Sequence, residues 1–99
     1  MKIYDLYGSA SLTPTDLREQ VGRELGLVFE EHAGGYRYRD GRRGEELVIR
    51  AAEPAGDGQA ESPTYQTLLE VNRSPRADEL LPVLSALPGL TFLRRDLER

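Results

Sequence analysis

A few clusters of polar residues in this sequence have the residue types that chemistry needs, and the first surrounds its single histidine. Glu30, Glu31 and His32 are consecutive, and carboxylates beside an imidazole can hold a metal ion or act as a general base. Successive residues of a strand point to opposite faces, so Glu30 and His32 share a side and Glu31 does not. Two ligands do not make a site. We interpret this cluster as a polar strand end that runs into a glycine turn, and we expect no metal and no cofactor.

A second cluster alternates aromatic and basic residues over residues 36–43. Arginines beside stacked aromatic rings commonly bind single-stranded RNA. The same pattern arises when tyrosines pack on a core and arginines keep an edge strand soluble. Tyrosine and arginine are also enriched in protein-binding hot spots. The candidate partner-binding residues are Tyr36, Arg37, Tyr38, Arg39, Arg42 and Arg43, together with Asp57 and Glu61 from an acidic loop further along the chain.

Asp5 is a third candidate, because it lies inside the expected first strand between Tyr4 and Leu6. A carboxylate there pairs with an arginine, faces water or serves chemistry. Tyr4-Asp5 ahead of a helix resembles the small CRISPR-associated nuclease-like proteins of ferredoxin-like fold, and this resemblance implies that Asp5 is a metal ligand at a dimer interface. Such a site needs Mg²⁺ held by carboxylates and a basic surface for the nucleic-acid backbone. The helix that follows is instead charge-balanced.

The composition limits the kinds of function. The 99 residues suffice for one domain with a single site or binding face. The absence of cysteine excludes disulfides and thiol catalysis, and with one histidine it also excludes ordinary structural zinc sites. A net charge of -4 and a pI of about 5.0 disfavour nucleic acid and anionic membranes and favour a cationic partner. Since the first residues lack an apolar signal core and no run is long enough for a membrane helix, we expect a cytoplasmic protein.

Two helices can be located from their ends. Thr13 and Asp16 form a capping box around Pro14, and Gly26 ends the first helix. The second helix is expected to begin after residue 75 and to end before residue 88, with a kink or a division into two pieces at Pro82. The residues expected to face the sheet are Leu17, Val21 and Leu25 in the first helix and Ala77, Leu80, Leu81, Leu84 and Leu87 in the second.

Period-two alternation predicts strands between the helices. Residues 53–63 have no large apolar side chain, so we expect a mobile loop there that a partner could order. The order of strand, helix, hairpin strands, helix and strand resembles the ferredoxin-like fold with an extra hairpin. We therefore predict one α+β domain over residues 1–99, a two-layer sandwich in which an antiparallel sheet of five or six strands has both helices on one face. The alternating positions are Leu27 and Phe29, Tyr36 and Tyr38, Leu47, Ile49 and Ala51, and Thr67, Leu69 and Val71.

The chain also resembles known proteins over most of its length, and the resemblance lies in residues at helix caps, turns and core positions. The segments Leu12-Thr13-Pro14-Thr15-Asp16-Leu17, Gly26-Leu27-Val28-Phe29-Glu30-Glu31 and Pro75-Arg76-Ala77-Asp78-Glu79-Leu80-Leu81 resemble small proteins of GC-rich bacteria. Some of those are similar to immunity proteins of polymorphic-toxin and contact-inhibition systems. The resemblance implies a cytoplasmic antagonist that binds and blocks a toxin domain without doing chemistry.

The residues are compatible with that function, because an acidic protein associates faster with a basic partner. They leave two other functions open. One is a nucleic-acid-binding or metal-dependent nuclease-like protein that uses Asp5 and the arginines. The other is a regulatory domain that binds a small ligand in a pocket near the glycine turns. An open sheet face or edge strand also favours a homodimer.

Overall fold

The computed structural model describes residues 1–52 and 65–99. The loop expected over residues 53–63, with Asp57 and Glu61, lies outside the described residues. The elements in chain order are β1 (Lys2–Ser9), α1 (Pro14–Leu25), β2 (Glu30–His32), β3 (Gly35–Asp40), β4 (Glu45–Ala51), β5 (Thr67–Asn72), α2 (Ala77–Ser85) and β6 (Thr91–Glu98).

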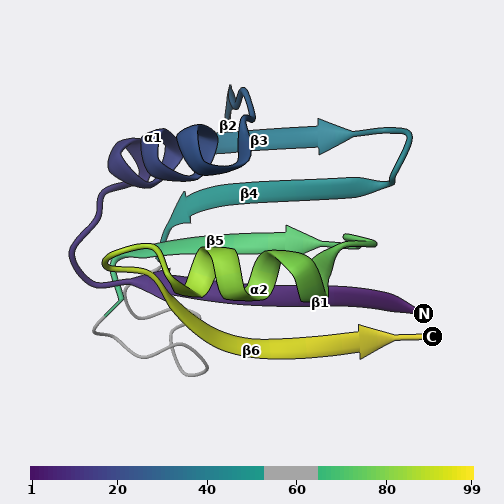
Figure 1. Ribbon diagram of the computed structural model, residues 1–99. Coiled ribbons are helices and arrows are strands. Elements are labelled where there is room, and N and C mark those ends of the chain that lie inside the picture. The colour runs from purple at the N-terminus through teal and green to yellow at the C-terminus, as the bar shows by residue number, and fades with distance from the viewer. Residues whose placement is uncertain (53–64) are drawn as a thin grey trace.

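The strands form one antiparallel sheet in the order β2-β3-β4-β5-β1-β6. Both helices cover the same face, as Figure 1 shows. The helix α1 packs over β3 and β4, and α2 contacts β6. The predicted two-layer α+β sandwich is therefore confirmed, with the four-strand meander β2–β5 placed between the two helices in the sequence. One sheet face has no helix on it, and this open face bears on the candidate site.

The helix α1 has the ends that the sequence predicts. The Thr13 side chain accepts a hydrogen bond from the backbone amide of Asp16, and the Asp16 side chain accepts one from the amide of Thr13. Pro14 occupies the first turn, where its missing N–H costs nothing. Gly26 ends the helix with φ 69°, a left-handed conformation that glycine adopts without strain. Leu17 and Val21 are fully buried against the sheet.

The helix α2 is one element, so the predicted division into two pieces at Pro82 is wrong. A proline inside a helix removes one hydrogen bond, here to the carbonyl of the residue four positions earlier, in the first turn. Pro82 is solvent-exposed, so the carbonyl that loses its partner can be hydrated. On the opposite side Ala77, Leu80 and Leu84 are buried, and their burial holds the helix on the sheet.

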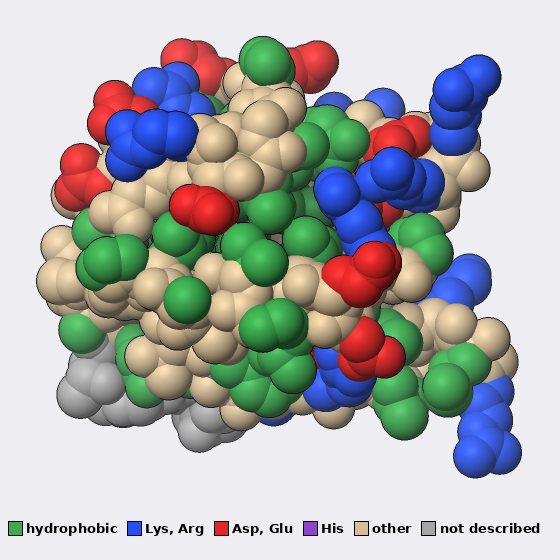
Figure 2. Space-filling model, in the orientation of Figure 1, with side chains coloured by type: hydrophobic (Ala, Val, Ile, Leu, Met, Phe, Trp, Pro, Cys, Tyr) green, Lys and Arg blue, Asp and Glu red, His purple; other side chains and the backbone are tan. Residues whose placement is uncertain are grey.

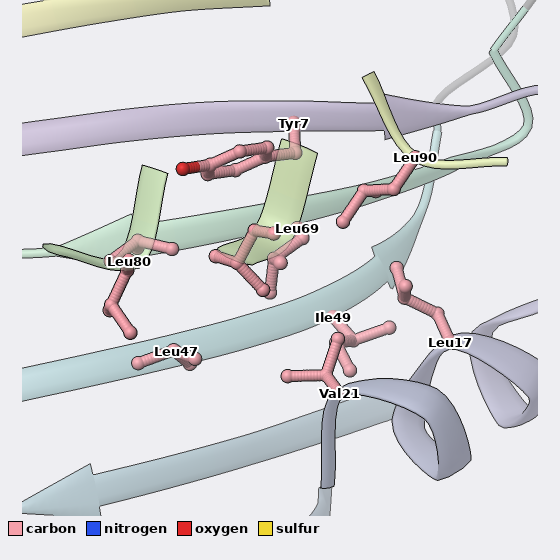
Figure 3. Close-up of a cluster of buried hydrophobic side chains, with 10 residues drawn as sticks. Tyr7, Leu17, Val21, Leu47, Ile49, Leu69, Leu80 and Leu90 are labelled. Atoms are coloured by element: carbon pink, nitrogen blue, oxygen red, sulfur yellow. The ribbon is translucent and has the colours of Figure 1, made fainter. Parts of the chain in front are cut away.

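The core lies between the sheet and the helices. Figure 3 shows its buried hydrophobic side chains as one cluster, with Tyr7 of β1 at one side and Leu17 and Val21 of α1 at the other. Period-two alternation predicted that alternate residues of β4 and β5 face the core. This is confirmed for Leu47, Ile49, Leu69 and Val71, which are all buried. The strand expected at Leu27 and Phe29 begins only at Glu30, although both side chains pack on the core.

The hairpin of β2 and β3 fits closely against β4. Its turn consists of Ala33 and Gly34, both with positive φ, as a two-residue hairpin turn requires. A Cβ atom on Gly35 would lie 2.1 Å from the carbonyl oxygen of Ile49. Only glycine fits there, because real Cβ atoms do not approach backbone so closely. Gly35 therefore lets the hairpin pair with β4 in its observed register.

Candidate functional site

The two tyrosines of the predicted partner-binding segment face the helices. The Tyr36 hydroxyl shares a hydrogen bond of 3.0 Å with Thr15 of α1, and the guanidinium of Arg18 lies over its ring at 4.8 Å. The Tyr38 ring packs against Phe29, with 6.2 Å between the ring centroids. Both tyrosines are half-buried and flank the core. Their contact area is largely used within the fold.

The arginines that alternate with these tyrosines point away from the helices. Arg37 and Arg39 alternate with the core-facing tyrosines, so they stand on the open face of the sheet. The register sets Arg37 opposite Glu30 and Val48, and Arg39 opposite Glu46. In the described part of the chain neither arginine has a carboxylate within ion-pair distance. The structure thus separates an aromatic side from a basic side of β3.

Arg42 and Arg43 lie in the turn after β3. The Asp40 carboxylate accepts hydrogen bonds from the backbone amides of both residues and lies 3.7 Å from the Arg43 guanidinium. Both side chains are exposed to solvent. Asp40 therefore organises the turn, and the two arginines extend from it.

Val28 is a surface residue that the sequence reasoning did not single out. Its side chain is 84% exposed, the highest value among the large apolar residues described. With Glu30, Arg37, Tyr38 and Arg39 it lines a hollow of about 270 Å³. A signal was available: Leu27 and Phe29 face inward, so the β-branched residue between them must face outward. We call Val28, Arg37 and Arg39 the β3 edge patch.

A second hollow of about 430 Å³ lies at the glycine turn, where a small-ligand pocket was expected. All its lining residues are consecutive, from Glu31 to Tyr36, so one hairpin forms it with no opposing wall from a helix. Ligand pockets usually bury most of their ligand between several elements. This hollow lacks such enclosure.

Asp5 pairs with an arginine, which is the first of the roles that its position allows. Arg95 of β6 donates to both carboxylate oxygens of Asp5, at 2.7 and 2.9 Å, and also to Asp78 of α2 at 2.6 Å. These hydrogen bonds, the one to Asp5 first, raise the pKa of Arg95. Asp5 is 2% exposed. A metal ligand needs free carboxylate oxygens, and here both are engaged by a guanidinium.

The Tyr7 hydroxyl lies in the same part of the core. Tyr7 is completely buried, and its hydroxyl has no hydrogen-bond partner among the described residues. Burial first, and then the negative charge of Asp5, raise the pKa of Tyr7, so the hydroxyl stays protonated and cannot serve as a base at neutral pH.

A second buried carboxylate, Glu45, ties β4 to the start of α2. Arg76 donates to both of its oxygens, at 3.0 and 2.9 Å, and the Ser74 hydroxyl donates to one of them. Burial alone would raise the pKa of Glu45, but the hydrogen bonds from Arg76 and Ser74 outweigh it and leave the pKa below its ordinary value. Figure 2 shows basic and acidic side chains together at this end of the molecule. Glu45 and Asp5 act as structural anchors of α2.

The histidine cluster has the geometry of a strand end. Glu30, Glu31 and His32 are all exposed on β2, and the turn follows directly. Within residues 1–52 and 65–99, no three His, Asp or Glu side chains converge as metal ligands would. Neither described helix has the length and apolar character that a membrane crossing needs.

Comparison with protein-family models, with curated proteins and with solved structures finds no match for this chain. Roles for its residues therefore come from geometry and chemistry alone. On those grounds the β3 edge patch is a candidate binding surface, because it combines arginines without carboxylate partners among the described residues and an exposed apolar side chain.

Proposed function

We propose that this protein is a non-enzymatic protein-binding domain, and most concretely a cytoplasmic bacterial immunity protein that binds and blocks a toxin domain. The proposal rests on a surface. The β3 edge patch brings together the exposed Val28 and two arginines that have no carboxylate partner among the described residues. Arginine is among the residues most often found to dominate protein interfaces. The toxin as partner follows from the sequence resemblance and from the net charge of -4.

The buried polar groups that could do chemistry are either paired within the fold or enclosed in the core, which supports binding over catalysis. Asp5 and Glu45 are engaged by Arg95 and Arg76. The Tyr7 hydroxyl is enclosed in the core. Among the described side chains, these are the buried groups whose chemistry an enzyme would most readily use.

The test is capture of a partner on the tagged protein in bacterial cells, followed by reconstitution from purified components. We expect one protein retained in stoichiometric amount, toxic when expressed alone and inactive when this protein is co-expressed. Retention of nuclease-sensitive RNA or DNA in place of a protein, lost when Arg37 and Arg39 are changed to Glu, would reject the proposal in favour of nucleic-acid binding.

A further inference from the structure

Some arginines of the described residues pair with carboxylates of the fold, and about as many do not. Those on β4, after β5, at the start of α2 and on β6 all lie within 4.0 Å of a carboxylate: Arg50, Arg73, Arg76, Arg94 and Arg95. Among the described residues of α1, β3 and the following turn, Arg18, Arg23, Arg37, Arg39 and Arg42 have no such carboxylate. A guanidinium has five N–H donors in a fixed fork. Among the groups on a protein surface, carboxylates match this geometry best.

The spacing of the β3 edge patch defines what fits on it. Arg37 and Arg39 are two residues apart on one face of β3, which sets their Cα atoms about 7 Å apart. Carboxylates at alternate positions of an extended segment have the same spacing. Val28 lines the same hollow as both arginines and leaves its side chain exposed. Its position offers a contact for an apolar side chain next to the carboxylates.

We propose that the β3 edge patch binds an extended acidic segment of the partner protein, with carboxylates at alternate positions on Arg37 and Arg39 and a neighbouring apolar side chain on Val28. This inference deepens the proposed function and rests on it. The net charge of this protein favours a partner with a positive net charge, whereas the β3 edge patch requires a negatively charged segment on that partner. Long-range attraction and the local contact therefore involve different parts of the partner.

Nucleic acid fits this patch less well. Single-stranded nucleic acids are bound by arginines together with aromatic rings on which bases stack. Tyr36 and Tyr38 are half-buried and pack on the core, so their rings are largely covered. Glu30 and Glu46 stand opposite the two arginines on the neighbouring strands and repel any anionic ligand, so the distinction from nucleic acid rests on the covered rings and on the spacing of the two arginines.

The test uses a synthetic peptide with glutamates at two alternate positions, leucine at the next alternate position and serines between. A control peptide has the same composition with the two glutamates adjacent. Both are titrated into isotope-labelled protein, and the resonances of the Val28 methyl groups and of the Arg37 and Arg39 side chains are followed. We expect saturable shifts at these groups with the first peptide and binding up to about fivefold weaker with the second, since one exposed ion pair is lost.

Matched variants locate the binding. Arg39→Glu should weaken binding about tenfold, while Arg42→Glu, the same change in the adjacent turn, should have little effect. Val28→Ser should weaken it, and Leu97→Ser, at the exposed apolar residue of β6, should not. Shifts centred on β6, equal binding of both peptides, or stronger shifts from a single-stranded oligonucleotide would overturn the inference. A captured toxin whose affinity ignores Arg37→Glu and Arg39→Glu would also overturn it, and would leave the proposed function standing.

Discussion

The start of α2 and the β3 edge patch use the same residue type in opposite ways. At the start of α2, Arg76 and Arg95 reach carboxylates that are almost completely buried, Glu45 and Asp5. On β3, Arg37 and Arg39 have only exposed or half-buried carboxylates near them in the sheet register, and they pair with none of those described. The difference is the carboxylate. A buried one must be compensated and fixes an arginine in place, whereas an exposed one is hydrated and does not.

The comparison shows how to separate arginines that fold the protein from arginines that remain available. Pairing with a carboxylate of the fold, most firmly with a buried one, marks the first class, and arginines that pair with no described carboxylate form the second. The residue type and the secondary structure do not separate the two classes of arginine, because Arg39 and Arg95 both lie on strands. The predictions below alter one side of this comparison at a time.

The largest effect is expected from Glu45→Ala. It leaves Arg76 without its carboxylate in a half-buried position and removes the link between β4 and α2. We expect the free energy of unfolding to fall by about 3 kcal/mol, measured by urea denaturation. Glu70→Ala is the control, because Arg50 and Glu70 are both about a third exposed, and it should cost less than about 1 kcal/mol. Equal losses in the two variants would remove the distinction between buried and exposed pairs.

The same pair should make stability depend on pH. The pKa of Glu45 in the folded state lies below its ordinary value of 4.5, so its ionised form is favoured by folding. The contribution is therefore complete above pH 4.5 and is lost as the pH falls through the lower folded-state pKa. Urea unfolding of the wild type and of Glu45→Gln should show a stability difference that shrinks on acidification below that value. A difference that stays constant with pH would contradict this assignment.

Much of the fold follows from local patterns, whereas these pairs do not. The caps of α1 need only Thr13, Asp16 and Gly26, and the alternation on β4 and β5 needs only neighbours in sequence. The pairing of Asp5 with Arg95 joins residues 90 positions apart, and nothing near Asp5 indicates which arginine will arrive. Acidic and basic residues are spread along the whole chain. Their order in the sequence therefore does not indicate which arginines pair with a buried carboxylate and which stand on the open face.

The next largest effect is expected at the hairpin that carries the patch. Gly35→Ala forces a Cβ against the Ile49 carbonyl, so the hairpin must shift away from β4. We expect a loss of about 2 kcal/mol and faster amide exchange in β2 and β3, with β1 and β6 unchanged. Gly41→Ala is the matched control, since nothing lies within 4 Å of a Cβ there. Uniform loss of protection over the sheet would show that the hairpin is not a separable unit.

Removal of the Tyr7 hydroxyl should be favourable. A buried hydroxyl without a partner carries a desolvation penalty, and phenylalanine retains the ring that contacts Phe92 with 5.4 Å between centroids. Tyr7→Phe should raise the free energy of unfolding by about 1 kcal/mol in the same urea assay. A loss of similar size would mean that the hydroxyl has a partner, for example a buried water, and would place it with the compensated groups around Asp5.

The smallest effect is expected on β3 itself. Arg37→Ala and Arg39→Ala remove side chains without carboxylate partners, so the free energy of unfolding should change by less than about 0.5 kcal/mol. Thermal unfolding of each variant beside Arg95→Ala, which uncovers Asp5, gives the contrast directly. If the β3 variants unfold as readily as Arg95→Ala, these arginines stabilise the fold, and the case for their availability to a partner is lost.

The position of β1 has a consequence for the biosynthesis of this protein. This strand is made first, yet its two neighbours in the sheet are β5 and β6, at residues 67–72 and 91–98. Contacts so distant in sequence slow folding, because the intervening chain must be closed into a loop before they form. The segment from α1 to β4 can pair locally as it leaves the ribosome, while β1 waits for the last residues of the sheet. Protection of β1 from proteolysis should therefore come only once β6 has left the ribosome.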